Sequence, residues 1–258
     1  MPLPSWINRF ELKPNCWVYV PSKETIKEGR IIKSYLEKYW LPPFYYCHLN
    51  PGGHVKALKL HIKSNFFIRA DISQFFNRIN RSRVTREFKK FYPSYKIARE
   101  NACKSIVPSP VDKGNFILPF GFVQSPIIAS ICLSNSRLGK FLTGLVSKGY
   151  AVSIYMDDII ISDNNFVIRS ELNKSYDKLH EAANRSGFEL NMHKTLSPEN
   201  KITAFNVELS NNHLAITNDR YKRFLDEALM GSDTTKEGMA NYISSISATQ
   251  EASFRALL

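Results

Sequence analysis

Helices are predicted where apolar residues recur every three to four positions. An apolar stripe follows the capping Ser22 and predicts a helix over residues 22–40, which Pro42-Pro43 ends. Ser125-Pro126 offers a capping serine and a first-turn proline ahead of a long apolar segment. The predicted helices span 22–40, 81–92, 94–106, 125–147, 165–186 and parts of the polar tail 219–258.

Strands are predicted where short apolar segments lie between turn residues. The expected strands are 54–62, 65–72, 116–118, 151–155, 159–162, 188–191, 202–209 and 213–217. Helices and strands do not alternate regularly along the chain. This order favours an α+β fold with an antiparallel sheet over a doubly wound parallel sheet.

The composition fits a chain with a sizeable core. Of 258 residues, 43% are apolar and 22% are charged, which excludes disordered, collagen-like and coiled-coil chains. No uncharged apolar stretch reaches the roughly 18 residues of a membrane span, and the first residues lack a signal-peptide pattern. The four cysteines are scattered, without disulfide or zinc-ligand spacing. We therefore expect a cytoplasmic protein that has no membrane partner.

Positive charge is concentrated in the first part of the chain. Residues 1–110 hold 20 Lys/Arg against 7 Asp/Glu, a net +13, whereas residues 111–258 hold 15 against 16, a net −1. Such asymmetry is typical of a protein with a polyanionic partner, most often a nucleic acid. A solvated basic face without a specific partner is the alternative.

Three carboxylates lie at the ends of strongly apolar segments. Asp157 and Asp158 are predicted at the tip of a hairpin, and Asp71 ends another apolar strand. If these strands are neighbours, the carboxylates converge into an oxygen-only site that suits Mg²⁺ or Mn²⁺. Such a site, beside a basic half, indicates a metal-dependent nucleotidyltransferase or nuclease. The alternatives are turn chemistry for Asp157-Asp158 and a helix cap for Asp71.

Four segments together resemble a known family. Residues 155–158, Tyr-Met-Asp-Asp inside an apolar hairpin, resemble the catalytic signature of reverse transcriptases. Three further segments of the chain resemble motifs of bacterial reverse transcriptases. They are FIRADISQFFNRI at 67–79, LPFGFVQSP at 118–126 and GFELNMHKT at 187–195. These motifs follow the family's order and spacing and cover about residues 55–217. The resemblance is to retron, group II intron and defence-associated enzymes rather than to retroviral ones.

The resemblance implies a right-hand polymerase fold whose palm sheet carries the aspartates. Fingers would span 1–64 and 81–117, the palm 65–80 and 118–217, and a reduced thumb of about two helices and a tail 218–258. The implied activity is RNA-directed DNA polymerisation, in which dNTPs are added to a 3′-hydroxyl. In these 258 residues we expect no RNase H, integrase, maturase or endonuclease segment. We expect a compact bacterial enzyme that acts with a non-coding RNA in anti-phage defence, where RNA, a partner protein or a second copy completes the thumb.

The resemblance also assigns roles to single residues. Asp71 and Asp157 would bridge two Mg²⁺ ions, with Mn²⁺ as an alternative, and Asp158 would join or support these ligands. Lys194 would protonate the departing pyrophosphate. Phe76 would exclude a ribose 2′-hydroxyl as the steric gate, unless it is a core aromatic. Other substrate contacts are expected from the backbone of Ile72, Ser73, Gln74 and Phe75, and from Phe120, Lys56 and Lys59.

Nucleic-acid contacts are expected from Gln124, Ser125, Tyr155, Met156, Arg78, Arg81 and Arg83. One departure concerns the nucleotide, because Phe120 stands where many relatives carry a polar residue, often Gln. An aromatic ring there should change stacking on the incoming nucleotide.

Alternatives to templated synthesis are template-independent or protein-primed DNA synthesis, a catalytically idle RNA-binding scaffold, and a two-metal nuclease.

Overall fold

The computed structural model describes residues 3–163 and 169–258. An antiparallel sheet of four strands lies at its centre in the order β6-β7-β3-β8. The strands are β6 (Tyr150–Tyr155), β7 (Asp158–Asp163), β3 (Phe67–Asp71) and β8 (Leu196–Glu199). The α+β fold and the antiparallel sheet predicted from the sequence are therefore confirmed.

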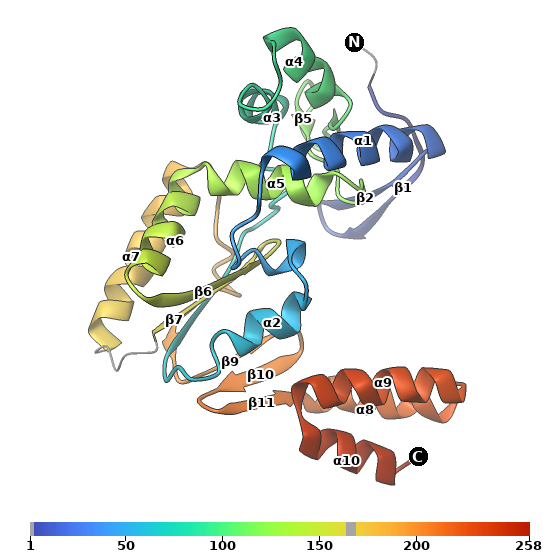
Figure 1. The fold of residues 1–258 in the computed structure, drawn as a ribbon, viewed down its shortest axis with the longest axis vertical. Coiled ribbons are helices and arrows are strands. Elements are labelled where there is room, and N and C mark those ends of the chain that lie inside the picture. Colours follow the sequence, from blue (N-terminus) through green and yellow to red (C-terminus); the bar gives the residue numbers. More distant parts are fainter. Residues whose placement is uncertain (1–2, 164–168) are drawn as a thin grey trace.

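Both faces of this sheet are covered, which is why its strands are almost continuously apolar. Figure 1 shows α5 (Ser125–Ser134), α6 (Arg137–Ser147) and α7 (Arg169–Arg185) on one side of the sheet. Their apolar side chains share a core with Ile68, Ile154 and Ile161. On the other side Phe67 and Ile160 belong to a second core, with residues of α2 and of the C-terminal elements.

The predicted helix 125–147 is wrong as a single element. The chain forms two helices, α5 and α6, with a break at Asn135 and Ser136. Ser136 has extended backbone angles, and its hydroxyl accepts a hydrogen bond from the Gly139 N–H, which makes it the N-cap of a new helix. A Cβ at Gly139 would lie 2.1 Å from the Leu133 carbonyl oxygen, so glycine permits this tight junction.

A second group of elements stands above the sheet in Figure 1. The helices α1 (Lys23–Tyr39), α3 (Arg81–Phe88) and α4 (Tyr95–Cys103) confirm three predictions. The strands are β1 (Trp6–Lys13), β2 (Cys16–Pro21), β4 (Val107–Pro108) and β5 (Phe116–Ile117). The hairpin β1–β2 was not expected, and the Tyr19 N–H ties it to the Phe120 carbonyl at 2.9 Å.

Several other predicted elements are corrected. Residues 54–62 are not a strand: after the 3-10 turn Cys47–Leu49 they form helix α2 (Gly53–Lys59). Gly52 and Gly53 both have positive φ, and this turn leads into a helix that buries Ala57 and Leu58. Residues 188–191 contribute only an isolated bridge between Ile72 and Leu190. Strand β8 was missed, and residues 165–168 of the predicted helix 165–186 lie outside the described residues.

The C-terminal part is more elaborate than predicted. Segment 202–209 is two strands, β9 (Lys201–Ala204) and β10 (Val207–Ser210), because Phe205 and Asn206 turn the chain with positive φ. Strand β11 (His213–Ile216) completes this small sheet. The tail forms three helices rather than two and a tail, namely α8 (Asn218–Leu229), α9 (Asp233–Ile246) and α10 (Ala248–Ala256).

These three helices lie at the end of the molecule away from α3 and α4 (Figure 1). They bury Phe224, Ile243 and Phe254, and Gln250 ties α10 to β11 through two hydrogen bonds with Ile216. Among the described helices, none combines the length and the apolar character that crossing a bilayer requires. The four cysteines have no disulfide partners.

Candidate active site

The structure brings Asp71, Asp157 and Asp158 together at one end of the central sheet. Asp71 and Asp158 face each other in the β3–β7 register. The N–H of Ile72 donates to the Asp157 carbonyl at 2.9 Å, and the N–H of Asn191 donates to the Asp71 carbonyl at 2.8 Å. Backbone pairing therefore fixes the acidic segments to one another, as the sequence predicted.

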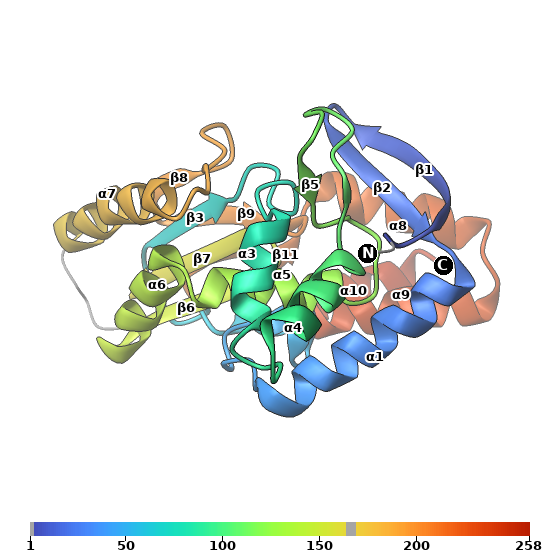
Figure 2. The same cartoon turned by 90° about the horizontal axis from the view of Figure 1, so that it is seen from above.

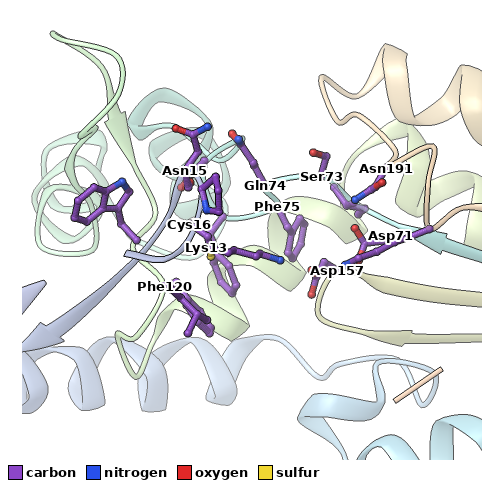
Figure 3. A pocket seen from close by; sticks show the side chains of 17 residues that line it. Lys13, Asn15, Cys16, Asp71, Ser73, Gln74, Phe75, Phe120, Asp157 and Asn191 are labelled. Carbon is purple, nitrogen blue, oxygen red and sulfur yellow. Dashed lines mark hydrogen bonds and ion pairs between the residues drawn. The ribbon is translucent and has the colours of Figure 1, made fainter. Parts of the chain in front are cut away.

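Asp157 occupies a two-residue turn between β6 and β7. Tyr155 pairs with Asp158 across the hairpin, and Met156 has a φ of 58° in the left-handed region. A non-glycine residue adopts this conformation only at the cost of local strain. Figure 3 shows the side chains of Asp157 and Asp71 side by side at one end of a cavity.

Basic side chains contact two of the three carboxylates. The Lys194 ammonium lies 2.9 Å from Asp71 Oδ2, and the Arg69 guanidinium lies 3.0 Å from Asp158 Oδ1. The hydrogen bond to Asp71 raises the pKa of Lys194. Burial raises the pKa of Asp157 to about 6, and the neighbouring charges of Asp158 and Asp71 add to the shift. Asp157 therefore carries a negative charge that a further cation would stabilise.

The donor set suits a hard divalent cation. Asp71 and Asp157 supply carboxylate oxygens, which Mg²⁺ and Mn²⁺ prefer over nitrogen or sulfur. Within 3–163 and 169–258, however, no three or more His, Cys, Asp or Glu side chains form a group arranged to hold a metal ion. Asp158 is directed to Arg69 instead. The chemistry thus fits an ion shared by Asp71 and Asp157, with Asp158 in a supporting position.

A cavity of about 460 Å³ opens from the two aspartates. Six of the eight predicted substrate residues line it, as do Asp71, Asp157 and Lys194. The six are Ile72, Ser73, Gln74, Phe75, Phe76 and Phe120. Figure 3 shows Phe120 at the opposite end of this space from Asp71. The cavity joins the predicted catalytic and substrate-binding residues into one site.

Lys56 and Lys59 are not among the residues that line this cavity. They belong to α2, which lies beside the 3-10 turn Cys47–Leu49 and β6. The cavity lining therefore gives no support to their predicted contact with the substrate, which stays a prediction. The assignment came from their resemblance to basic fingers residues after the Gly52-Gly53 turn, and the segment that carries them is helical.

The tip of the β1–β2 hairpin places a basic residue at the cavity. Lys13, Asn15, Cys16 and Trp17 line the cavity, and Figure 3 shows Lys13 extending from the hairpin across it. The Asn77 amide donates to the Asn15 carbonyl at 3.0 Å, which joins the tip to the segment after Asp71. Pro14-Asn15 between two apolar-polar segments was the available hairpin signal.

Two adjacent phenylalanines have different environments. Phe75 is 3% exposed and belongs to the core, where its ring contacts Phe188. Phe76 is half-buried and lines the cavity, with its ring centroid 5.5 Å from that of Phe120. Phe76 also packs against the main core, so its position is compatible with both the steric-gate and the core interpretation, and the gate stays a prediction.

Two predicted template contacts are wrong as side-chain contacts. Gln124 is 0% exposed and Ser125 is 1% exposed, so neither side chain can reach a template without rearrangement. A Cβ at Gly29 would lie 2.2 Å from Gln124 Oε1, which shows how closely α1 covers this position. Gln124 Oε1 and Ser125 Oγ have no hydrogen-bond partner among the described residues.

The three predicted arginines each have a partner within the protein. Arg83 lies over the Phe188 ring at 4.2 Å and donates to the Ser186 carbonyl, and its contact with nucleic acid stays a prediction. Arg78 pairs with Glu189, and Arg81 lies over the Phe116 ring at 4.6 Å. The neighbouring Arg86, Lys89 and Lys90 are exposed, and they too have partners, Glu87 for Arg86 and Lys90 and the Tyr95 ring for Lys89.

Tyr155 and Met156 stand next to the aspartates but are half-buried. The Tyr155 ring contacts His48, His54 and Phe205. Because Phe205 lies in the β9–β10 turn, the catalytic hairpin is connected to the C-terminal sheet. The predicted contact of Tyr155 and Met156 with nucleic acid stays a prediction.

A protein-family model matches most of the chain, including most of the site described above. The sequence model of the reverse transcriptase (RNA-dependent DNA polymerase) family matches residues 25–199. This range contains α1 except for its first two residues, the central sheet and the aspartates. The hairpin β1–β2 and the three C-terminal helices lie outside it.

Two solved structures have a similar fold. A telomerase from Candida albicans, in complex with a fragment of telomeric RNA, superposes with a TM-score of 0.54 at 10% identity, over 81% of this chain and 42% of the telomerase chain. A foamy viral protease-reverse transcriptase, in complex with double-stranded DNA, gives a TM-score of 0.50 at 15% identity, over 90% and 34% of the two chains. The chain thus spans less than half of either protein, and the likeness concerns the fold.

Proposed function

The chain belongs to the reverse transcriptase (RNA-dependent DNA polymerase) family, and from this membership we propose that it is an RNA-directed DNA polymerase. It would bind an RNA template and a DNA product and add dNTPs to a 3′-hydroxyl. The observation that carries the proposal is the joining of Asp71, Asp157 and Lys194 with Phe76 in one cavity. A catalytically idle scaffold would have no need to place these groups together.

Reverse transcriptase domains generally use divalent metal ions, and Asp71 and Asp157 would hold two Mg²⁺ ions here, with Mn²⁺ as an alternative. The ions would supply charge stabilisation at the reacting phosphate and lower the pKa of the 3′-hydroxyl. Lys194 lies 2.9 Å from Asp71 and would donate a proton to the departing pyrophosphate. Arg69 would keep Asp158 in its supporting position.

The incoming nucleotide would lie in the cavity with its sugar against Phe76 and its base towards Phe120. The backbone from Ile72 to Phe75 would then follow the triphosphate, and the Lys13 ammonium would neutralise part of its charge. This assignment transfers to Lys13 the role that the sequence suggested for Lys56 or Lys59. It also explains why the tip of the hairpin is joined to Asn77.

The Lys13→Ala variant tests the nucleotide site. We expect the KM for dNTPs to rise about 10–100-fold, because an ammonium–phosphate contact contributes about 1.5–3 kcal/mol. Lys59→Ala is the matched control, since Lys59 lies on α2 outside the cavity, and its KM should stay within about twofold of wild type. Steady-state kinetics on a defined primer–template measure both values. Equal KM values for the two variants would contradict the placement of Lys13.

The finer biological setting is also part of the proposal. The motifs resemble retron, group II intron and defence-associated enzymes, so we propose a bacterial, cytoplasmic enzyme that works with a non-coding RNA in anti-phage defence. Its three C-terminal helices have only 12, 14 and 9 residues. A structured RNA, a partner protein or a second copy of the chain would complete the grip on the duplex.

One assay separates the proposed function from its alternatives. Purified protein is incubated with Mg²⁺, labelled dNTPs and an RNA template of defined sequence that carries an annealed DNA primer. We expect a product that copies the template and disappears when RNase precedes the reaction. A homopolymer that resists RNase would indicate template-independent synthesis. Cleavage of the template, or no product with Mg²⁺ or Mn²⁺, would contradict polymerase activity.

A further inference from the structure

His48 lies directly beneath the catalytic turn, although no sequence motif marks it. It is the middle residue of the 3-10 turn Cys47–Leu49, and its imidazole is half-buried. The N–H of Met156 lies 3.1 Å from His48 Nδ1, and the Ser130 hydroxyl oxygen lies 2.8 Å from His48 Nε2. The imidazole therefore joins the β6–β7 turn to helix α5.

The partners of this ring define its tautomer. His48 Nδ1 lies 3.1 Å from the Met156 N–H and 3.4 Å from the Ile154 carbonyl oxygen. The nearer contact is to a group that can only donate, which favours an Nδ1 that accepts and carries no proton. The Ser130 hydroxyl donates to the Pro126 carbonyl at 2.9 Å, so its oxygen accepts from Nε2–H. The result is a neutral ring with its proton on Nε2. Burial, which lowers the pKa of His48 to about 4, agrees with this neutral form.

The acceptor lies at the residue of the turn that has the strained backbone. Met156 has a φ of 58°, and the next residue is Asp157. A hydrogen bond to the Met156 N–H fixes the peptide plane between Tyr155 and Met156, and with it the direction in which Asp157 leaves the turn. The His48 ring also contacts Tyr155 edge-on, with centroids 5.8 Å apart.

The other end of the connection leads to the nucleotide side of the cavity. Pro126 and Ser130 lie in the first turns of α5, and the loop before this helix carries Phe120. A single ring thus connects the segment of Asp157 with the helix that follows the Phe120 loop. This connection holds the Asp157 end of the cavity and its Phe120 end at a fixed separation.

We propose that His48 is a positioning residue for the catalytic turn, which holds Asp157 by accepting the Met156 N–H and fixes that turn relative to α5. The inference rests on the proposed polymerase function. A lost positioning contact should reduce kcat, because small displacements of a reacting group reduce rates steeply. Affinity for the nucleotide should change little, because His48 is not among the residues that line the cavity.

Two substitutions separate the two sides of the ring. In His48→Asn the side-chain amide oxygen can take the place of Nδ1, whereas in His48→Gln the amide reaches only towards Ser130. We expect His48→Gln to lower kcat on the order of 10–100-fold with the KM for dNTPs within about twofold. His48→Asn should keep kcat within about threefold of wild type. Tyr45→Phe is the control: it removes a hydroxyl that bonds Thr143, not the turn.

Hydrogen exchange gives a readout that needs no activity. The Met156 amide should exchange slowly in wild type, His48→Asn and Tyr45→Phe, and about tenfold faster or more in His48→Gln. A wild-type protein without polymerase activity that still shows this pattern would overturn the proposed function but keep the contact. Equal loss of kcat in both His48 variants, or unchanged exchange in a folded His48→Gln, would overturn the positioning role.

Discussion

Asp157→Asn is expected to abolish incorporation of dNTPs, with a fall in kcat/KM on the order of 10³-fold or more. The substitution keeps the shape of the side chain but removes the charge that would hold a metal ion. Metal ions contribute several kcal/mol of charge stabilisation at a reacting phosphate, and each 1.4 kcal/mol is tenfold in rate. Single-nucleotide incorporation with Mg²⁺ measures the loss.

The same experiment has an internal stability control. The Asp157 carboxylate is partly buried beside Asp158 and Asp71, so its neutralisation should leave the unfolding midpoint equal or higher. Asp71→Asn should be equally inactive but less stable, because it breaks the pair with Lys194. Asp177→Asn on the exposed side of α7 should change neither property. Near-normal incorporation by either of the first two variants would overturn the metal assignment.

The aspartates could be predicted from sequence because each ends a locally apolar strand. Asp71 follows Phe67-Ile68, and Asp158 precedes Ile159-Ile160, so strand, turn and acid are adjacent in the chain. Antiparallel pairing then brings Asp71 opposite Asp158. The nine sites that sequence placed correctly in the cavity lie in such local motifs. They are Asp71 to Phe76, Phe120, Asp157 and Lys194.

Lys13, the basic residue that we propose for the nucleotide, could not be placed in this way. Lys13 is 58 positions before Asp71 in the sequence, and contacts from Tyr19 to Phe120 and from Asn77 to Asn15 bring it to the cavity. Neither contact has a periodic signal. Lys56 and Lys59 were nearer in sequence, but the Gly52-Gly53 turn starts a helix that directs this segment elsewhere.

The burial of Gln124 also depends on a contact with a residue that is far away in the sequence. Gly29 on α1 has no side chain, and this allows α1 to approach Gln124 so closely that a Cβ would overlap its amide oxygen. His48 was missed for a related reason, since its partners Met156 and Ser130 are 108 and 82 positions away. Local motifs therefore predicted the acids, whereas the groups that hold or shield them depend on tertiary contacts.

Phe76→Val is expected to let ribonucleotides compete with dNTPs. The phenyl ring lines the cavity at the position where the sugar would lie, and it is held in place by Phe120 at a centroid distance of 5.5 Å. Valine opens space beside C2′, and discrimination by fit of this kind amounts to about 10–200-fold. The ratio of kcat/KM for a dNTP and its rNTP should fall by that order.

The ratio distinguishes a gate from a core residue, because a loss of stability lowers both values of kcat/KM together. Phe91→Val is the matched control: Phe91 is also half-buried against the main core but is not among the residues that line the cavity. Both variants lose apolar contact and should lower the unfolding midpoint similarly, but only Phe76→Val should change the ratio. A Phe76→Val protein with a lower midpoint and unchanged discrimination would make Phe76 a core residue, and the sugar would then have to be selected elsewhere in the cavity.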